Sequence, residues 1–175
     1  MSEKKGFFMH LMGKQAVPSD GSEIIAAPLD GRAIDITEVS DKVFADKILG
    51  DGMAVIPDNG RLYAPIDGTV ENLLETKHAL CMVSAGGVEL LIHVGRDTVS
   101  LNGKHFTMHV EEGQKVKRGQ LLLEFDREAL LSEGFDLATP VVVSNSSEFV
   151  MEKSASGAVS CGDVLFRLVP KTANN

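Results

Sequence analysis

From Ile24 onward, short hydrophobic runs alternate with clusters of Gly, Pro, Asn and Asp. The runs are rich in Val, Ile and Leu, and the turn-forming clusters recur roughly every 8–12 residues. This spacing is typical of an antiparallel β-sandwich or barrel. We therefore predict an all-β domain: a compact, barrel-like antiparallel β-sandwich with an internal pseudo-repeat and a few short helices.

The clearest hairpin signal lies between Thr76 and Gly95. Two strands, Thr76–Val83 and Val88–Gly95, flank the turn residues Ser84–Gly87. If the turn is centred between Ala85 and Gly86, residues whose numbers sum to 171 face each other across the hairpin, and His78 is opposite His93. Opposed side chains lie on one face with Cβ atoms roughly 4.5–5.5 Å apart. The sequence thus predicts two neighbouring imidazoles, and a slip of one residue would separate them.

Alternation along the second strand predicts which side chains share a face. One face holds Val88, Leu90, Ile92 and Val94, and the other holds Glu89, Leu91 and His93. Thr76 precedes His78 by two residues and is expected on the histidine face, whereas Cys81 is expected on the opposite face. A hydroxyl should therefore lie beside the two imidazoles.

Two internal echoes indicate that one structural unit is used twice. The segment Ala27–Gly31 (APLDG) recurs as Ala64–Gly68 (APIDG), thirty-seven residues later. The spacing of Val116, Gly119 and Leu122 recurs in Val159, Gly162 and Leu165. In each case a Gly turn leads into an apolar strand, which fits a pseudo-symmetric fold better than a solenoid.

Helical segments are predicted to be few. Asp41–Leu49 and Asp126–Glu133 have helical patterns with Asp41 and Asp126 as N-caps. Residues 1–22 differ from the rest: 4–14 form a basic, amphipathic stretch, and 15–22 resemble a linker. The stretch is either a tail resting on the domain or a weak membrane contact. We assign 1–22 to this segment, 23–170 to the domain and 171–175 to a tail.

Charge and cysteine content narrow the function classes. The 175 residues carry a net charge of −8, which argues against nucleic-acid binding and favours a basic protein partner. Cys81 and Cys161 are the only cysteines, and no signal peptide is evident, so free thiols in a reducing cytoplasm are expected. No apolar run approaches the roughly 18 residues of a membrane span.

The predicted histidine pair is compatible with three chemistries. A zinc ion needs three or four ligands, and the pair supplies two. Acid–base catalysis at a nucleophilic side chain is a second reading. Phosphoryl relay is the third, in which one ring nitrogen attacks phosphorus and its neighbour bonds the phosphoryl oxygens. Glu89, Asp97 and Asp41 are the candidate carboxylates nearby, and His10, His105 and His109 are read as exposed spectators. No nucleotide-binding motif occurs.

A series of motifs between Ile25 and Val169 resembles one protein family. In order, they are APLDG (27–31), VSDKVFADKILGDGMAVIP (39–57), APIDGTV (64–70), ETKHA (75–79), GVELLIHVGRDTVSLNG (87–103), EEGQKVKRGQ (111–120) and TPVVVSN (139–145). The chain resembles the glucose-type enzyme IIA of the bacterial phosphoenolpyruvate-dependent sugar phosphotransferase system. The resemblance implies a β-sandwich built from a duplicated hybrid motif.

The resemblance also implies roles for individual residues. His93 would accept a phosphoryl group from phospho-HPr and pass it to a cysteine of the sugar-specific IIB protein or IICB fusion, without a cofactor. His78 would bond the phosphoryl group, and Thr76 would orient the network. Asp41 and Asp97 match aspartates at the rim of the site. The residues that match an apolar docking patch are Val43, Phe44, Ile48, Leu74 and Val99.

Three positions depart from the family pattern. Lys42 and Arg96 stand where aliphatic residues are common, which would change partner docking. His105 replaces a usual glycine, so we expect a differently bent turn. The alternatives are a regulatory protein of the same fold that binds transporters or kinases, a zinc peptidase, and a biotinyl or lipoyl carrier. The zinc-ligand motifs and the carrier lysine of the last two are not seen.

Overall fold

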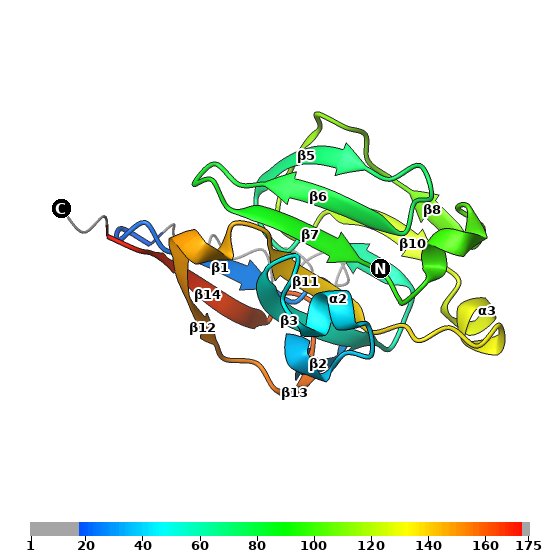
Figure 1. Cartoon of the computed structure of the whole chain (residues 1–175). Coiled ribbons are helices and arrows are strands. Elements are labelled where there is room, and N and C mark those ends of the chain that lie inside the picture. The colour runs from blue at the N-terminus through cyan, green and yellow to red at the C-terminus, as the bar shows by residue number, and fades with distance from the viewer. Residues whose placement is uncertain (1–17, 173–175) are drawn as a thin grey trace, which may run out of the picture.

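The computed structural model describes residues 18–172, which form three antiparallel sheets. In Figure 1, the large sheet has the order β13-β2-β3-β11-β7-β6-β5-β9, and the small sheets have the orders β1-β14-β12 and β4-β10-β8. The strands are β1 Glu23–Ala26, β2 Gly31–Asp35, β3 Asp51–Pro57, β4 Arg61–Tyr63, β5 Gly68–Leu73, β6 Ala79–Val83, β7 Glu89–His93, β8 Phe106–Met108, β9 Lys115–Val116, β10 Leu121–Phe125, β11 Thr139–Val143, β12 Phe149–Lys153, β13 Gly157–Val159 and β14 Val164–Pro170. The predicted all-β class is confirmed.

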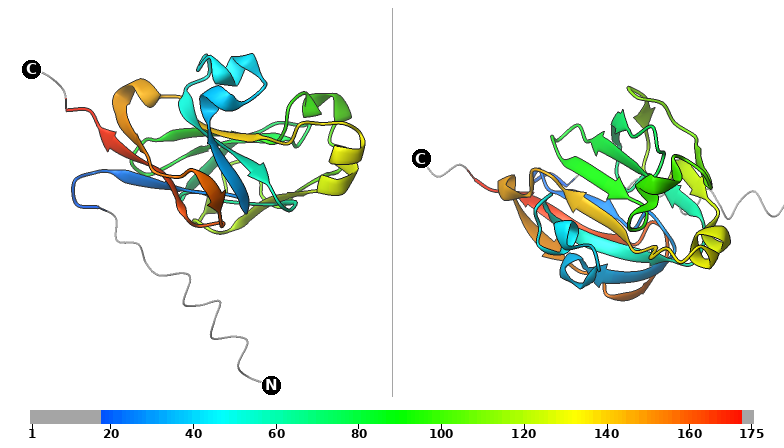
Figure 2. Two further views of the ribbon diagram at one scale, coloured as in Figure 1. Left: turned by 90° about the horizontal axis from the view of Figure 1, so that it is seen from below. Right: turned by 45° about the vertical axis from the view of Figure 1, so that its right-hand side comes forward.

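The helical segments are short and lie at the margins of the sheets. They are the α-helices α2 Lys42–Ala45 and α3 Arg127–Ser132 and the 3₁₀-helices η1 Ile36–Glu38, η2 Thr98–Leu101 and η3 Ser146–Glu148. In Figures 1 and 2, α2 projects from one face of the large sheet, and the small sheets lie on the other side. No helix among residues 18–172 has the length and apolarity needed to cross a bilayer.

Both predicted N-caps are present. The Asp41 carboxylate accepts a hydrogen bond from the Val43 amide at 3.0 Å, and the Asp126 carboxylate accepts one from the Ala129 amide at 3.1 Å. Each bond satisfies an otherwise free amide in the first turn. The helix predicted over 41–49 ends early, at Ala45. Lys47 has a left-handed φ of 57°, which continues the chain as turns instead of helix.

The main core fills the space between the sheets, and a smaller cluster lies on the opposite face of the large sheet. That smaller cluster consists of Ile34, Ile36, Val39, Phe44, Ala54 and Val142. It is covered by the connection between β2 and β3, residues 36–50, which we call the cover segment. The cover segment therefore rests on a second, shallow hydrophobic contact and not on the main core.

The first internal echo corresponds to repeated backbone contacts. The Ala27 carbonyl accepts a hydrogen bond from the Gly162 amide at 2.9 Å, and the Ala64 carbonyl accepts one from the Gly119 amide at 2.8 Å. Each alanine begins one copy of the echoed motif, and each glycine lies in one copy of the Gly turn. The two predicted echoes are therefore parts of the same unit.

Side chains repeat the same arrangement. The Asp30 carboxylate accepts from the Cys161 amide, and the Asp67 carboxylate accepts from the Arg118 amide, both at 2.7 Å. In the large sheet, the run β13-β2-β3-β11 mirrors the run β9-β5-β6-β7, and the two runs meet where β11 pairs with β7. The predicted pseudo-repeat is confirmed in the strand order and in the contacts.

Contacts with the folded domain extend into the stretch before Glu23. Within the stretch interpreted as a linker, Ser22 is fully buried, and the Arg167 guanidinium bonds both its hydroxyl and the Asp20 carboxylate. The chain is thus anchored from Asp20. The amphipathic stretch 4–14 and His10 lie outside the described residues, as does most of the predicted tail.

Candidate functional site

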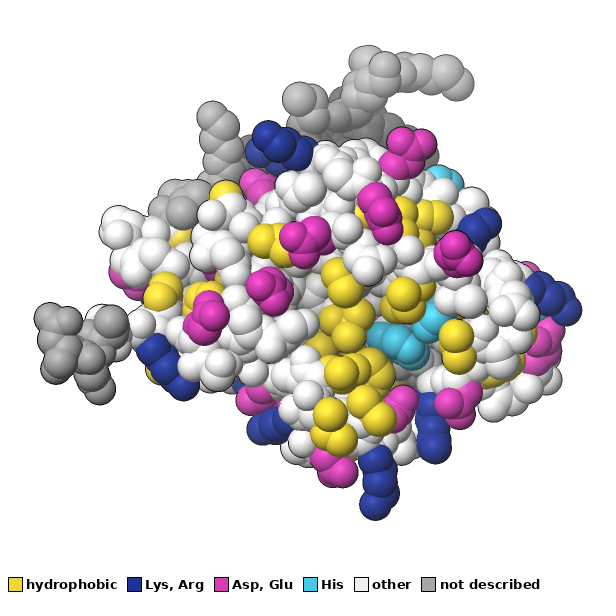
Figure 3. All heavy atoms as spheres, turned by 45° about the horizontal axis from the view of Figure 1, so that its top comes forward, with side chains coloured by type: hydrophobic (Ala, Val, Ile, Leu, Met, Phe, Trp, Pro, Cys, Tyr) yellow, Lys and Arg dark blue, Asp and Glu magenta, His cyan; other side chains and the backbone are white. Residues whose placement is uncertain are grey.

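His78 and His93 meet at one end of the β6–β7 hairpin. Their ring centroids are 4.7 Å apart and their ring planes are nearly perpendicular, at 85°. His78 is only 2% exposed, whereas His93 is half-buried. Figure 3 shows histidine at the surface, bordered by hydrophobic side chains with charged groups farther out. The predicted proximity of the two imidazoles is confirmed.

The strand register that led to this prediction is wrong by one residue. Ala79, not His78, is opposite His93, because the paired numbers sum to 172. The turn is a three-residue loop closed by a bond from the Ser84 amide to the Val88 carbonyl, and Gly87 has a left-handed φ of 86°. Three-residue loops of this type commonly end in a left-handed residue. The extra loop residue shifts the pairing.

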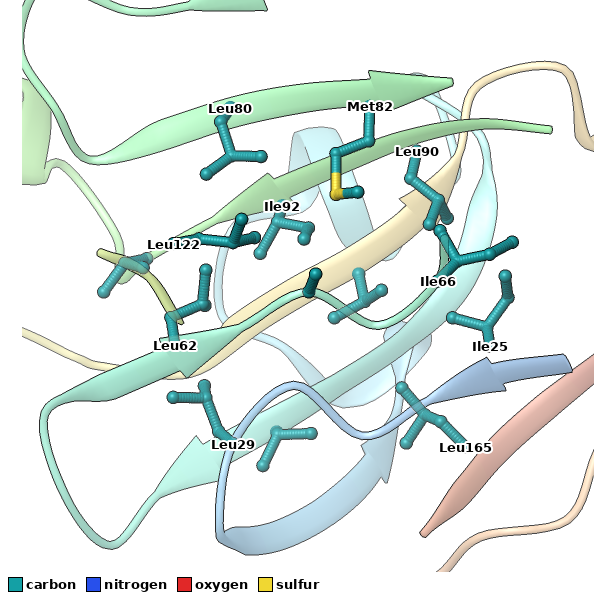
Figure 4. Packing of buried hydrophobic residues seen from close by; sticks show 14 of the residues in the cluster. Ile25, Leu29, Leu62, Ile66, Leu80, Met82, Leu90, Ile92, Leu122 and Leu165 are labelled. Carbon is teal, nitrogen blue, oxygen red and sulfur yellow. The ribbon is translucent and has the colours of Figure 1, made fainter. Parts of the chain in front are cut away.

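The inward face of β7 is as predicted. Its alternate side chains are buried: Val88, Leu90, Ile92 and Val94. In Figure 4, Leu90 and Ile92 point into the core together with Leu80 and Met82 of β6. Because this face is fixed by burial, His93 must point to the other face, toward solvent. The hydrophobic core therefore orients the candidate nucleophile.

The position of the His78 side chain beside His93 is not explained by the alternation of side chains along a strand. It lies in a bend just before β6, and the preceding Lys77 has a left-handed φ of 58°. The His78 carbonyl still accepts a 2.7 Å hydrogen bond from the Val94 amide. The backbone bend therefore brings the His78 ring to the His93 side although His78 lies outside the ladder.

The corrected register also moves Cys81. It pairs with Leu91 and lies on the same face as Ala79 and His93, not on the opposite face. Cys81 and Cys161 are both free and half-buried. Burial raises the pKa of the Cys81 thiol, and the carboxylates of Glu71 and Glu89 add to this effect. Cys81 is therefore mainly the protonated thiol at neutral pH.

Hydrogen bonds orient both imidazoles. The Nδ1 atom of His93 lies 2.8 Å from the Gly95 carbonyl oxygen. A carbonyl can only accept, so Nδ1 carries the proton and the Nε2 atom of neutral His93 has a free lone pair. The Nδ1 atom of His78 lies 2.8 Å from the Thr76 hydroxyl, as the sequence predicted. The Gly95 carbonyl was not foreseen, because no side-chain pattern marks it.

Burial keeps both imidazoles neutral. Burial lowers the pKa of His78 to about 4, and the neighbouring charge of His93 acts in the same direction. Burial also lowers the pKa of His93, against the opposing effects of the Gly95 carbonyl and the carboxylates of Asp41 and Asp97. A neutral His93 is the form that can act as a nucleophile.

Two of the three candidate carboxylates lie near the histidines. Asp41 caps α2, and the Asp97 side chain is exposed and ion-paired with Arg96 at 3.6 Å. Their charges both act on His93. Glu89 lies at the other end of β7, where its amide bonds Asn145. The structure therefore separates Glu89 from the site.

Hydrophobic side chains are exposed on the cover segment and on the residues just before His78 and just after His93. The exposed fraction is 42% for Val43, 70% for Ile48, 42% for Leu74 and 52% for Val99. Leu49, which the sequence analysis did not single out, is 39% exposed. Phe44 differs from them because it is only 3% exposed. Its ring centroid is 5.1 Å from that of His93, so Phe44 forms a wall of the site and not its outer surface.

The three departures from the family pattern lie in different surroundings. Lys42 and Arg96 are exposed beside Asp41 and Asp97. His105 is half-buried and its ring bonds the Glu133 carboxylate at 2.8 Å, so it is not the exposed spectator that was expected. Its φ of 73° is one that glycine adopts readily. His109 is exposed and bonds Glu124.

Metal binding was one of the chemistries open to the histidine pair. Within residues 18–172, no group of three or more His, Cys, Asp or Glu side chains is arranged to hold a metal ion. The arrangement that the structure does provide is a half-buried neutral imidazole with one free nitrogen, a second imidazole beside it, and an apolar rim. An imidazole in this arrangement can act as a nucleophile.

Comparisons with known proteins agree with this arrangement. Residues 23–149 match the family model described as phosphoenolpyruvate-dependent sugar phosphotransferase system, EIIA 1. A Dickeya chrysanthemi protein named PTS system beta-glucoside-specific EIIBCA component is 47% identical over 148 residues, 84% of this chain and 24% of the relative. The chain thus spans about a quarter of that relative's length.

A solved structure shares the fold. Glucose permease IIA from Mycoplasma capricolum superposes with a TM-score of 0.80 at 34% identity, covering 83% of this chain and 95% of the other. The family model covers well over half of the chain, and the structural match extends to both halves of the pseudo-repeat. The chain therefore belongs to the EIIA 1 family of the phosphoenolpyruvate-dependent sugar phosphotransferase system.

Proposed function

We propose that His93 is the phosphoryl acceptor, receiving the group from phospho-HPr and passing it to a cysteine of a sugar-specific IIB domain. One observation carries the proposal: the bond from Nδ1 to the Gly95 carbonyl leaves the Nε2 atom of a neutral, half-buried imidazole as the free nucleophile. Membership of the family supports phosphoryl transfer in general.

The first transfer is a displacement at phosphorus. The Nε2 lone pair of His93 forms a bond to phosphorus while the bond between phosphorus and the donor histidine of HPr breaks, and the electron pair returns to that donor. In the second transfer, the thiolate of the IIB cysteine attacks the same phosphorus, and the electron pair returns to Nε2. Catalysis then consists mainly of positioning and charge stabilisation.

His78 is placed to serve the phosphoryl group after it arrives. When the Thr76 hydroxyl donates to Nδ1 of His78, the proton of that ring lies on Nε2. A neutral imidazole with a proton on Nε2 donates a hydrogen bond to a phosphoryl oxygen on the neighbouring ring. Thr76 therefore sets the tautomer, and His78 stabilises the transferring charge.

The rim of the site is suited to transient docking. Val43, Ile48, Leu74 and Val99 offer apolar contact, and the carboxylates of Asp41 and Asp97 face a basic partner. The same carboxylates disfavour lasting residence of a phosphoryl dianion on His93. The phosphoryl group consequently stays on His93 only until it is transferred to the next partner.

The proposal is tested by mass spectrometry of the intact chain after incubation with phosphoenolpyruvate, enzyme I and HPr. We expect one acid-labile phosphoryl group, mapped to His93 by tandem mass spectrometry and absent from His93→Ala. His109→Ala is the matched control, because His109 is an exposed histidine bonded elsewhere, to Glu124. Normal phosphorylation of His93→Ala would refute the assignment.

A further inference from the structure

A single lysine joins the two ends of the cover segment. Lys153 is the last residue of β12, in a small sheet, and its side chain is 23% exposed. Its ammonium bonds the carboxylate of Asp35 and that of Asp51, each at 2.9 Å. Asp35 ends β2 and Asp51 begins β3, so residues 36–50 leave and re-enter the large sheet at this one cation.

Each aspartate is also tied to the backbone next to it. The Asp35 carboxylate accepts from the Thr37 amide and caps η1, whose Glu38 side chain accepts from the Asp35 amide. The Asp51 carboxylate accepts from the Gly52 amide at 2.8 Å. Movement at the lysine is therefore transmitted directly to both ends of the segment.

The cation is needed to balance charge at this point. Because both bonds end at one ammonium, the two carboxylates lie close together and would repel each other without it. Burial by itself would raise the pKa of Asp35, but the bonds from Lys153 and Thr37 together outweigh burial and hold that pKa at about 2. The pKa of Asp51 is lowered in the same way, and that of Lys153 is raised. The neighbouring Lys47 reaches only Asp51, at 3.3 Å.

The cover segment carries three parts of the candidate site. Asp41 lies at its rim, Phe44 packs against His93, and Ile48 is the most exposed member of the docking patch. Its own hydrophobic contact with the sheet is limited to the smaller cluster. The Ser40 hydroxyl also bonds the Asp136 carboxylate at 2.6 Å. The position of the segment therefore depends on this one bond and on how firmly its two ends are held.

We propose that Lys153 is a positioning residue for phosphoryl transfer: by clasping Asp35 and Asp51 it fixes the cover segment, and thereby holds Phe44 against His93 and Ile48 at the docking surface. The proposal rests on the proposed function of His93. It assigns a role in partner docking to a residue on a different sheet, with no contact to the histidines of its own.

Lys153→Met tests this role, because it keeps the packed stem of the side chain and removes the charge. Amide hydrogen exchange over 42–48 should accelerate about tenfold relative to the amides of β7 and β11, as expected for losing bonds between charged groups. The KM for phospho-HPr should rise by a similar factor while kcat changes little. Lys153→Arg should remain within about twofold of the wild type.

Lys47→Met is the matched control. It removes one positive charge beside Asp51 but leaves the bonds from Lys153 to Asp35 and Asp51 in place. The proposal fails if the two methionine variants behave alike, if exchange rises equally in β7 and β11, or if Lys153→Arg is as impaired as Lys153→Met. The exchange measurement needs no phosphoryl donor. Its result is therefore separate from the question of whether wild-type His93 is phosphorylated.

Discussion

The ring of His78 stands edge-on to the ring of His93, with centroids 4.7 Å apart. Two imidazoles this close and this buried disfavour protonation of either, because a charge on one is felt by the other. The pair is thus held neutral, which the proposed transfer requires of both rings. Each ring has its own anchor: the Gly95 carbonyl for His93 and the Thr76 hydroxyl for His78.

Replacing His78 should separate the two transfer steps. We expect His78→Gln to accept a phosphoryl group on His93 but to pass it to IIB at least tenfold more slowly, since one stabilising donor in a transfer site contributes roughly 10²-fold or more. Rapid-quench measurement of each step checks this. His105→Gln, which alters a histidine bonded to Glu133, is the control and should leave both rates intact. An unchanged second step in His78→Gln would remove His78 from the mechanism.

Acid should affect stability through His78. Its pKa is about 4 in the folded chain and about 6.5 in the unfolded chain, so the unfolded state binds the proton first. The contribution to stability is therefore complete above pH 6.5 and is lost as pH falls toward 4. NMR titration of the ring protons and thermal melts across this range check the prediction. A His78 ring that titrates near pH 6.5 would contradict it.

The rate of phosphoryl transfer should depend on the fraction of His93 that is neutral. Burial lowers its pKa below the ordinary value, so the neutral nucleophile predominates at neutral pH. The rate of phosphorylation by phospho-HPr should be level near pH 7 and should fall only below pH 6.5. Rates measured at constant partner concentration, with HPr phosphorylated beforehand, isolate this step. A rate that already falls between pH 8 and 7 would indicate a raised pKa instead.

Phe44→Ala should impair both stability and transfer. The side chain is 3% exposed, and removal of a buried phenyl ring costs about 3–5 kcal/mol. It also removes the wall against which His93 rests. Phe106→Ala, in the main core beside Phe125, is the control for lost stability alone. At equal folded fractions, we expect slower phosphorylation only in Phe44→Ala, and equal rates in both variants would argue against a role for Phe44 in the site.

Ile48→Glu should weaken docking without affecting the fold. Ile48 is 70% exposed, so the change in unfolding free energy should be within about 0.5 kcal/mol. A carboxylate in an apolar contact surface should raise the KM for phospho-HPr about tenfold. Val150→Glu, on β12 and 51% exposed, is the control. Equal KM values for the two variants would place the docking surface elsewhere.

Local patterns were sufficient for much of the fold. Alternation along residues 88–94 correctly predicted the buried face of β7, and Asp41 and Asp126 were correctly predicted as N-caps. The repeated Ala-Pro motifs predicted the pseudo-repeat. The strand face and the caps depend on near neighbours in the chain, such as a free amide two or three residues away, and the pseudo-repeat was visible as a repeated motif, so all three could be predicted from the sequence.

The histidine site was predicted for a partly incorrect reason. The pair His78–His93 was inferred from a register that the loop ending at Gly87 shifts by one. A left-handed Lys77 then brings His78 out of the ladder and to the correct side. The length of this loop and the φ of Lys77 depend on small differences in local free energy, and the packing of the surrounding strands can outweigh such differences. Residue types alone therefore did not determine them.

Contacts between distant segments depended wholly on the assembled sheets. Lys153 meets Asp35 across 118 positions, Phe44 packs on His93 from a separate connection, and Arg167 anchors Asp20 across 147. None of these pairs has a sequence signature, because each partner is an ordinary charged or apolar residue in its own segment. They become neighbours because burial of the two apolar clusters brings their strands together, and that burial is a property of the whole chain.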